Sequence, residues 1–301
     1  MKNIFPNFKN IELRDINLFK DFFTDYNPQT SEWTFTNLFM WRNYYSFQWS
    51  IHKDWLLIIC LHSNGMCCAF QPLGPPSRKE VTILLLEWLR DEKRLSKPAI
   101  TRADSRLARE IKGINLLSIN PEREHFDYVY LRDNLVRLSG NKYSAKRNHI
   151  NKLLKRYNVR YDSLKATNIE GCIRLQEKWC RQKRCDEDMS LMGEWEAIKE
   201  VLIHYEALDL TGGVASIDNE VMAFTIGEML NHNTAVIHIE KADSDIPGLY
   251  PFINQRFSEY GFPDATYINR EQDLGLPGLR DAKLSYYPDH LVEKFSVTLE
   301  S

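Results

Sequence analysis

Residues 213–260 read GVASIDNEVMAFTIGEMLNHNTAVIHIEKADSDIPGLYPFINQRFSEY. Three runs within this stretch have the length and the β-branched content of strands: Gly213–Ile217, Val221–Met229 and Thr234–Glu240. Residues that favour tight turns separate them, at Asp218-Asn219 and at Asn231–Asn233. A loop with Gly and Pro follows, and the spacing of apolar residues predicts a helix from about Pro247 to Tyr260. The stretch therefore predicts an antiparallel meander, a glycine-containing turn and a helix.

The first half of the chain shows the same order of elements. Gln48–Cys60 reads as two short strands, and Asn64-Gly65 marks a hairpin turn. A Pro/Gly loop and a predicted helix at Arg78–Asp91 follow. Individual residues do not repeat, so only the element order indicates a duplication. We expect an α/β (α+β) fold of two domains, 1–135 and 136–301, each a mostly antiparallel mixed sheet flanked by helices.

Composition excludes several classes of protein. The chain has 301 residues, 43% of them hydrophobic and 27% charged, with a net charge of -2, so it is neither fibrous nor a polycation. The N-terminus lacks the apolar region of a signal peptide, and no apolar run reaches the ~20 residues of a membrane helix. We therefore expect a cytoplasmic protein with no transmembrane segment. Its six cysteines form no C-x-x-C pair, which favours reduced thiols over disulfides or a metal site.

A strongly basic segment stands out from this balanced chain. We expect a helix over Ser139–Tyr157, with one face formed by Tyr143, Arg147, Ile150, Leu154 and Tyr157. Eight basic residues and no acidic residue lie between the two ends of the segment: Arg137, Lys142, Lys146, Arg147, Lys152, Lys155, Arg156 and Arg160. One interpretation is a solvated face paired with acidic neighbours. The other is an anionic partner, such as the phosphates of tRNA, of a nucleotide cofactor or of lipid headgroups.

The turn after the third strand of the meander admits two interpretations. Backbone N–H groups at a helix N-terminus bind anions, and Gly248 precedes the predicted helix. A single glycine also serves simply to shape a turn, and Asp243 and Asp245 oppose a phosphate there. The motif alone favours the structural interpretation.

A denser polar run follows the strand predicted at Ala265–Asn269. Asn269, Glu271 and Asp273 lie at its exit, and Arg280 and Lys283 follow on a short helix. Such a set can hold a zwitterionic substrate, and a carboxylate can deprotonate an attacking amine. A structural ion-pair network that closes the domain explains the same residues equally well. Other catalytic motifs are absent, and we expect a strand histidine such as His238 to be structural.

Three blocks of the sequence together resemble one bacterial family. They are Arg137–Asn151; Glu240–Asp243 with Gly248-Leu-Tyr and Ile253-Asn; and Asn269–Arg280 with Lys283. The family is the one related to the C-terminal domain of phosphatidylglycerol lysyltransferase. The match is strongest from about residue 130 to the end of the chain.

The resemblance implies a tandem pair of GNAT-like domains, the acyl-CoA N-acyltransferase fold, and kinship with Fem-type aminoacyl-tRNA-dependent transferases. It implies candidate catalytic residues, namely Asn269, Glu271 and Asp273. It also implies candidate substrate-binding residues, namely Lys241, Asp243, Arg280 and Lys283. Candidates for holding tRNA or lipid phosphate are Lys142, Lys146, Arg147, Lys152 and Gly248.

Three functions stay open at this point. The first is transfer of an aminoacyl group from aminoacyl-tRNA to an amine or hydroxyl acceptor. The second is acyl-CoA-dependent N-acylation of a small amine, and the third is a non-catalytic binding module. The basic segment favours the first, as does the absence of the (Q/R)-x-x-G-x-(G/A) signature of CoA-binding enzymes. We expect no permanently bound cofactor. The expected partners are tRNA, an anionic lipid headgroup and a small-molecule acceptor.

Overall fold

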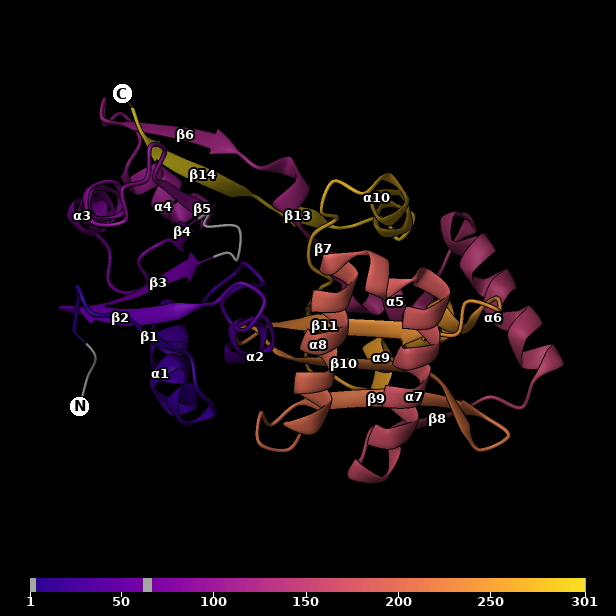
Figure 1. Cartoon of the computed structure of the whole chain (residues 1–301). Coiled ribbons are helices and arrows are strands. Elements are labelled where there is room, and N and C mark those ends of the chain that lie inside the picture. Colours follow the sequence, from indigo (N-terminus) through magenta and orange to yellow (C-terminus); the bar gives the residue numbers. More distant parts are fainter. Residues whose placement is uncertain (1–3, 62–66, 301) are drawn as a thin grey trace. The chain divides into compact units, whose positions relative to one another are not determined.

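The computed structural model describes residues 4–61 and 67–300. Contacts divide the chain into two compact units, drawn in Figure 1. Unit 1 contains the chain up to Asp127, Gln272–Arg280 and the segment from Leu291 onward. Unit 2 contains Tyr128–Glu271 and Asp281–His290. The domain boundary at residue 135 stays a prediction. Unit 1 contains two segments from the C-terminal part of the chain in addition to the N-terminal part.

Unit 1 is built on a seven-stranded sheet in the order β1-β2-β3-β4-β5-β14-β6. Its strands are β1 (Lys9–Asn10), β2 (Gln48–His52), β3 (Trp55–Leu61), β4 (Cys67–Phe70), β5 (Ala99–Asp104), β14 (Lys294–Leu299) and β6 (Leu117–Pro121). All neighbours are antiparallel except β4 and β5. Its α-helices are α1 (Ile16–Tyr26), α2 (Phe35–Met40), α3 (Lys79–Asp91) and α4 (Ser105–Glu110). The turn predicted at Asn64-Gly65 lies outside the described residues.

Burial of one face of α3 holds this unit together. Val81, Leu85 and Leu89 recur at helical spacing and are buried together with Leu57 of β3 and Ile100 of β5. The apolar stripe of the helix thus covers the sheet, as its periodicity predicts.

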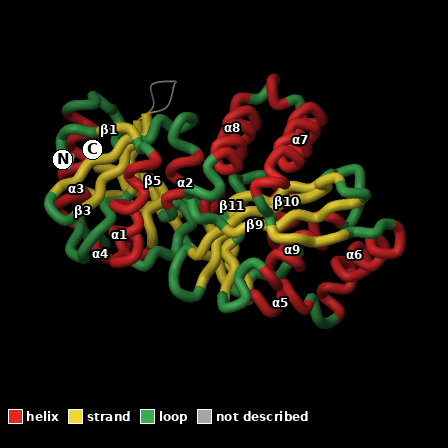
Figure 2. Tube along the Cα trace, turned by 90° about the horizontal axis from the view of Figure 1, so that it is seen from below, coloured by secondary structure: helices red, strands yellow, loops and turns green. Residues whose placement is uncertain are grey.

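A second seven-stranded sheet, in the order β13-β7-β12-β11-β10-β9-β8, belongs to unit 2 except for Asp127 of β7 and Leu291 and Val292 of β13. Its strands are β13 (His290–Val292), β7 (Asp127–Leu131), β12 (Tyr267–Asn269), β11 (Thr234–Ala242), β10 (Glu220–Met229), β9 (Thr211–Ile217) and β8 (Arg160–Ser163). Its helices are α5 (Arg132–Arg137), α6 (Ser144–Arg156), α7 (Ala166–Lys183), α8 (Met189–Ile203), α9 (Leu249–Tyr260) and the end of α10 (Pro277–Leu284). Figure 2 shows α7 and α8 on one face of this sheet and α5, α6 and α9 on the other. The predicted meander, turn and helix are confirmed as β9, β10, β11 and α9.

The basic helix α6 (Ser144–Arg156) is shorter than the predicted range Ser139–Tyr157. It begins at Ser144 rather than Ser139, because Leu138 and Gly140 adopt positive φ values of 45° and 83° that interrupt it. Ile150 and Leu153 are its buried apolar residues, whereas Leu154 is 42% exposed. The prediction that Leu154 shares one helix face with Ile150 is therefore wrong.

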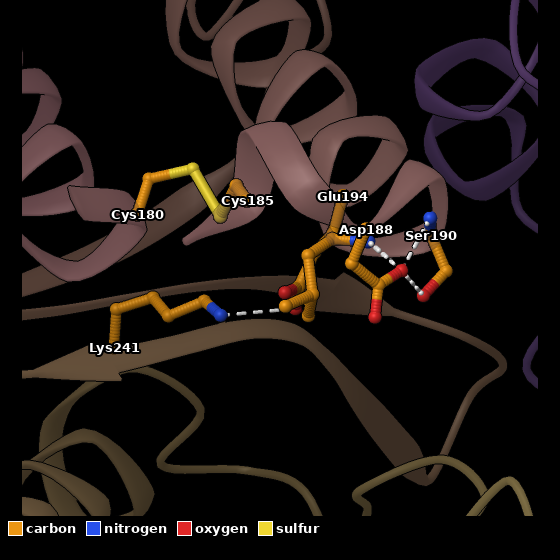
Figure 3. The surroundings of a disulfide bond; sticks show 7 residues. Cys180, Cys185, Asp188, Ser190, Glu194 and Lys241 are labelled. Carbon is orange, nitrogen blue, oxygen red and sulfur yellow. Dashed lines mark hydrogen bonds and ion pairs between the residues drawn. A yellow bond between two sulfur atoms is a disulfide. The ribbon is translucent and has the colours of Figure 1, made fainter. Parts of the chain in front are cut away.

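The expectation of six reduced cysteines is also wrong. Cys60 and Cys68 are paired Cα partners across β3 and β4 and form a disulfide. Cys180 forms the second disulfide with Cys185, because Arg184 adopts a left-handed conformation that ends α7 and turns the chain back (Figure 3). Cys172 remains a buried thiol, and burial raises its pKa to about 12.

Among the described residues, no helix combines the length and the apolar composition required to cross a membrane. The same part of the chain has no group of His, Cys, Asp or Glu side chains suited to hold a metal ion.

Candidate active site

Two parallel strands of unit 2 separate after a short shared segment. β11 and β12 pair only from Thr234 to Val236 on one strand and from Tyr267 to Asn269 on the other. β11 then continues to Ala242 without this partner. Ligands of open sheets bind where the carboxyl ends of parallel strands separate. Two groups of polar side chains come from these strands and their ends: His238 with Glu271, and Glu240 with Asn254 and Arg270.

A β-bulge places the first of these residues. The pairing of β10 with β11 steps from Gly227–Ile237 to Ile226–Ile239, so His238 has no Cα partner on β10. A β-carbon at position 227 would clash with the carbonyl oxygen of Val236, so the bulge requires glycine there. Bulges redirect side chains and are common beside active sites.

His238 lies between two carboxylates. Its Nδ1 is 2.9 Å from Oε1 of Glu271, and its Nε2 is 3.0 Å from Oε1 of Glu228. Its side chain is completely buried, which lowers its pKa, but the hydrogen bonds and charges of the two glutamates outweigh burial and raise the pKa to about 9. At neutral pH the imidazole is therefore a cation that donates to both carboxylates. His238 is thus a buried histidine with both ring nitrogens paired, as expected for a structural residue, but its two glutamate partners were not predicted.

The predicted residue Glu271 is held by its backbone as well as by His238. It adopts a positive φ of 57°, and its N–H donates to Oδ1 of Asn269 at 2.8 Å. Asn269 is completely buried, so its observed role is to fix this turn. The Glu271 side chain keeps 21% of its surface exposed. The Glu271 carboxylate is thus accessible at the surface of the site, and its backbone is held in a strained conformation by the hydrogen bond to Asn269.

Glu240 and Arg270 form a second polar group, which α9 contacts through Asn254. Arg270 Nη2 donates to Oε1 of Glu240 at 2.9 Å, and Asn254 Nδ2 donates to Oε2 at 2.8 Å. The guanidinium carbon lies 4.8 Å from the ring centre of Tyr286. Among the described residues, Nη1 of Arg270 and Oδ1 of Asn254 are buried without a hydrogen-bond partner. A buried donor and a buried acceptor of this kind are normally satisfied by water or by a ligand.

Two predicted lysines border this group. Lys146 Nζ donates to Oγ of Ser285 at 2.7 Å and lies 4.1 Å from the ring centre of Tyr286. Burial and the charge of Arg270 lower the pKa of Lys146. Lys283 Nζ donates to the backbone carbonyl of Arg270. The structure thus brings four predicted residues to this site: Asn269, Glu271, Lys283 and Lys146.

Lys241 and Asp243 are engaged with the helices α7 and α8. Figure 3 shows Lys241 reaching Glu194 of α8, with Nζ 3.0 Å from Oε1. Lys241 Nζ also lies 3.5 Å from the ring centre of Trp179, and burial lowers its pKa. Asp243 accepts from Lys178 of α7 at 2.7 Å. Both side chains therefore bind helices of their own unit in the structure.

Asp273 and Arg280 belong to unit 1. Asp273 is completely buried and pairs with Arg280 at 2.8 Å and with Arg123 at 3.2 Å. Its Oδ1 also accepts from the N–H of Gly275 at 2.8 Å. The observed arrangement is the structural ion-pair network that the sequence left open as an alternative.

The predicted phosphate-binding residues differ in their environments. Arg147 donates to the carbonyl oxygens of Leu138 and Gly140, so it anchors α6 to the end of α5. Lys142 and Lys152 are exposed, whereas Gly248 lies against α6. A β-carbon on Gly248, whose φ is 101°, would lie 2.6 Å from the carbonyl oxygen of His149. The glycine thus permits close packing of α6 on the turn before α9.

The chain is similar to one described protein family and to individual bacterial proteins. Residues 23–298 match the family described as "Phosphatidylglycerol lysyltransferase, C-terminal". A conserved protein of unknown function from Bacteroides thetaiotaomicron is 33% identical, with a TM-score of 0.89 over 97% of this chain and 99% of that one. An uncharacterised protein of Mycoplasmoides gallisepticum is 26% identical over 178 residues, which span 57% of this chain and 55% of that relative.

More distant structures share the fold. L-PGS from Bacillus licheniformis has a TM-score of 0.63 at 11% identity, over 94% of this chain and 91% of that one. FemX has a TM-score of 0.58 at 9% identity, over 97% and 96%. A tandem GNAT protein of the clavulanic acid pathway has a TM-score of 0.55 at 8% identity, over 97% of each chain.

The two mainly antiparallel sheets with flanking helices confirm the predicted α/β, tandem GNAT-like fold. Because the family match extends over most of its length, the chain belongs to the family described as "Phosphatidylglycerol lysyltransferase, C-terminal".

Proposed function

We propose that this protein transfers an aminoacyl group from aminoacyl-tRNA to an amine or hydroxyl acceptor. Membership in a lysyltransferase-related family supports transferase activity in general. The observation that carries the specific proposal is the pair of unsatisfied buried atoms, Arg270 Nη1 and Asn254 Oδ1, beside the Glu240 carboxylate. An aminoacyl ester offers complementary groups, because it has a carbonyl acceptor and an α-ammonium donor.

Each polar group has one role in the proposed reaction. Glu240 and Asn254 Oδ1 bind the α-ammonium group of the donor. Arg270 Nη1 donates to the carbonyl oxygen as negative charge develops on it. Glu271 accepts the proton of the attacking acceptor, and His238 holds this carboxylate in place.

The atoms of the transfer balance without a further reactant. The acceptor nitrogen or oxygen attacks the ester carbonyl carbon and forms an amide or ester bond. The bond between that carbon and the terminal ribose oxygen of the tRNA breaks. The acceptor proton moves to Glu271 and then to the leaving ribose oxygen. The donor ester is already activated, so orientation of the acceptor supplies much of the acceleration.

The basic helix supports RNA as the carrier of the donor. Lys142, Lys152, Lys155 and Arg156 of this segment are exposed. None of the ion pairs found among the described residues joins them to a carboxylate. Exposed cations without acidic neighbours attract phosphates and make RNA affinity salt-dependent.

The test follows a labelled aminoacyl group from tRNA to acceptors. The protein is incubated with charged tRNA and either phosphatidylglycerol vesicles or small amines, and labelled products are separated from tRNA. We expect wild-type transfer, a loss of about 10²- to 10⁴-fold in Glu271→Gln, and full activity in the exposed control Glu170→Gln. Transfer from acyl-CoA but not from charged tRNA would contradict the proposal and support the alternative donor.

A further inference from the structure

Unit 2 has a groove that the proposed reaction does not use. It has a volume of about 480 Å³ and lies among α6, β8 and α9. Six of the side chains that line it determine its chemistry: Leu154, Tyr161, Ser163, Phe252, Arg256 and Tyr260. A volume of this size lies in the range of small-molecule sites.

The groove exposes an aromatic surface. Tyr161 of β8 and Tyr260 of α9 stack with ring centres 5.6 Å apart and an interplanar angle of 28°. Tyr260 remains 58% exposed and Leu154 remains 42% exposed, so apolar surface faces solvent at this place. The close approach of the Tyr161 ring requires glycine at position 213, where a β-carbon would clash with it. The fold thus makes room for an aromatic pair whose outer member is open to a further planar group.

The charges around the groove favour an anionic occupant. Lys155 follows the lining residue Leu154 on α6 and is exposed. Arg160 precedes Tyr161 on β8, so its side chain points to the opposite face of the strand, where Nη2 donates to Oδ1 of Asn219 at 2.8 Å. Arg256 and Asp162 also line the groove, and Arg256 pairs with Glu259 at 2.8 Å. The basic segment that carries Leu154 has no acidic residue between Arg137 and Arg160. A planar, apolar surface beside such cations matches the bases and phosphates of single-stranded nucleic acid.

We propose that this groove binds a single-stranded segment of RNA, with a base stacked on Tyr260 and the adjacent phosphates near Lys155 of α6. That the RNA is tRNA rests on the proposed function. Binding of single-stranded RNA in the groove does not. Serine and backbone groups at the edge strand β8 supply hydrogen bonds to the base edge.

The competing occupant is an extended peptide. β8 is the last strand of its sheet order, and edge strands of this kind pair with added strands. β8 has only four residues, so an added strand would form few backbone hydrogen bonds. Strand addition would also leave the aromatic pair and the cations without a role. The observations therefore favour RNA.

The test measures binding of fluorescent tRNA and of a short labelled single-stranded RNA to the full chain. Loss of stacking in Tyr260→Ala predicts roughly 5- to 150-fold weaker binding of both probes, with an unchanged salt slope. Tyr260→Phe retains the ring and should bind as wild type. The control Ile203→Ala, at a 57% exposed position of α8 on the other face of the sheet, should also bind as wild type (Figure 2). Unchanged RNA affinity in Tyr260→Ala overturns the proposal.

A second measurement does not depend on the variants. RNA containing 4-thiouridine is crosslinked to the wild-type protein, and the labelled peptides are mapped by mass spectrometry. The proposal predicts crosslinks within β8 and the C-terminal half of α9. Crosslinks confined to other segments overturn it. RNA binding with these properties but without aminoacyl transfer would contradict the proposed function and leave this inference intact.

Discussion

The buried His238 makes the stability of unit 2 depend on pH. Its pKa is raised from 6.5 to about 9 in the folded chain. A raised folded pKa adds stability that is fully present below pH 6.5 and is lost as pH rises through about 9. The difference of about 2.5 pKa units corresponds to about 3 kcal/mol at 1.36 kcal/mol per unit.

The assay is urea unfolding of wild type and His238→Gln at a series of pH values from 6 to 10. We expect the free energy of unfolding of the wild type to fall by about 3 kcal/mol more than that of the variant across this range. The matched control is His290→Gln, because that histidine is 47% exposed and its ion pair is with the adjacent Asp289. It should retain the wild-type pH dependence. Parallel curves for wild type and His238→Gln would refute the reasoning.

Three further predictions test other parts of the structure. Gly248→Ala should lower the melting temperature markedly, because its β-carbon would meet the backbone of α6, whereas Gly113→Ala has a positive φ but open space and should lower it less. Arg147→Met should destabilise the chain by about 1–3 kcal/mol in urea unfolding, because two carbonyl oxygens lose their donor, while the exposed Lys152→Met should change stability by less than ~0.5 kcal/mol. Alkylation of the oxidised native protein should leave Cys172 unlabelled until urea unfolds the chain, because the thiol is buried and its pKa is raised; rapid labelling without urea would contradict its burial.

Local sequence signals predicted the meander and α9, because turn residues and apolar periodicity act over a few neighbouring positions. The site around His238 depends on non-local geometry. The carboxylates of Glu228, on β10, and of Glu271, after β12, are far apart in sequence. The bulge in β11 places the imidazole of His238 between them. Gly227 inside a strand pattern was the available signal, since an isolated strand glycine suggests a bulge.

The same limit explains the other differences. Cys60 and Cys68 meet because of strand register, which the eight-residue spacing does not reveal. Leu153 and Leu154 lie at i+3 and i+4 from Ile150, and both spacings suit one helix face, so periodicity alone does not decide which of the two leucines is buried. Asp273 is two residues from Glu271 in sequence, yet the chain passes from unit 2 to unit 1 between them.

The central claim is that the polar cluster near β11 and β12 recognises the aminoacyl group of a charged tRNA. The most direct measurement compares the affinity of charged and deacylated tRNA across a salt series, for wild type and for Asn254→Ala. We predict tighter binding of charged tRNA, a steep salt dependence for both forms, and loss of the preference in the variant without a change in salt slope. Equal affinity of the wild type for both forms would contradict the claim.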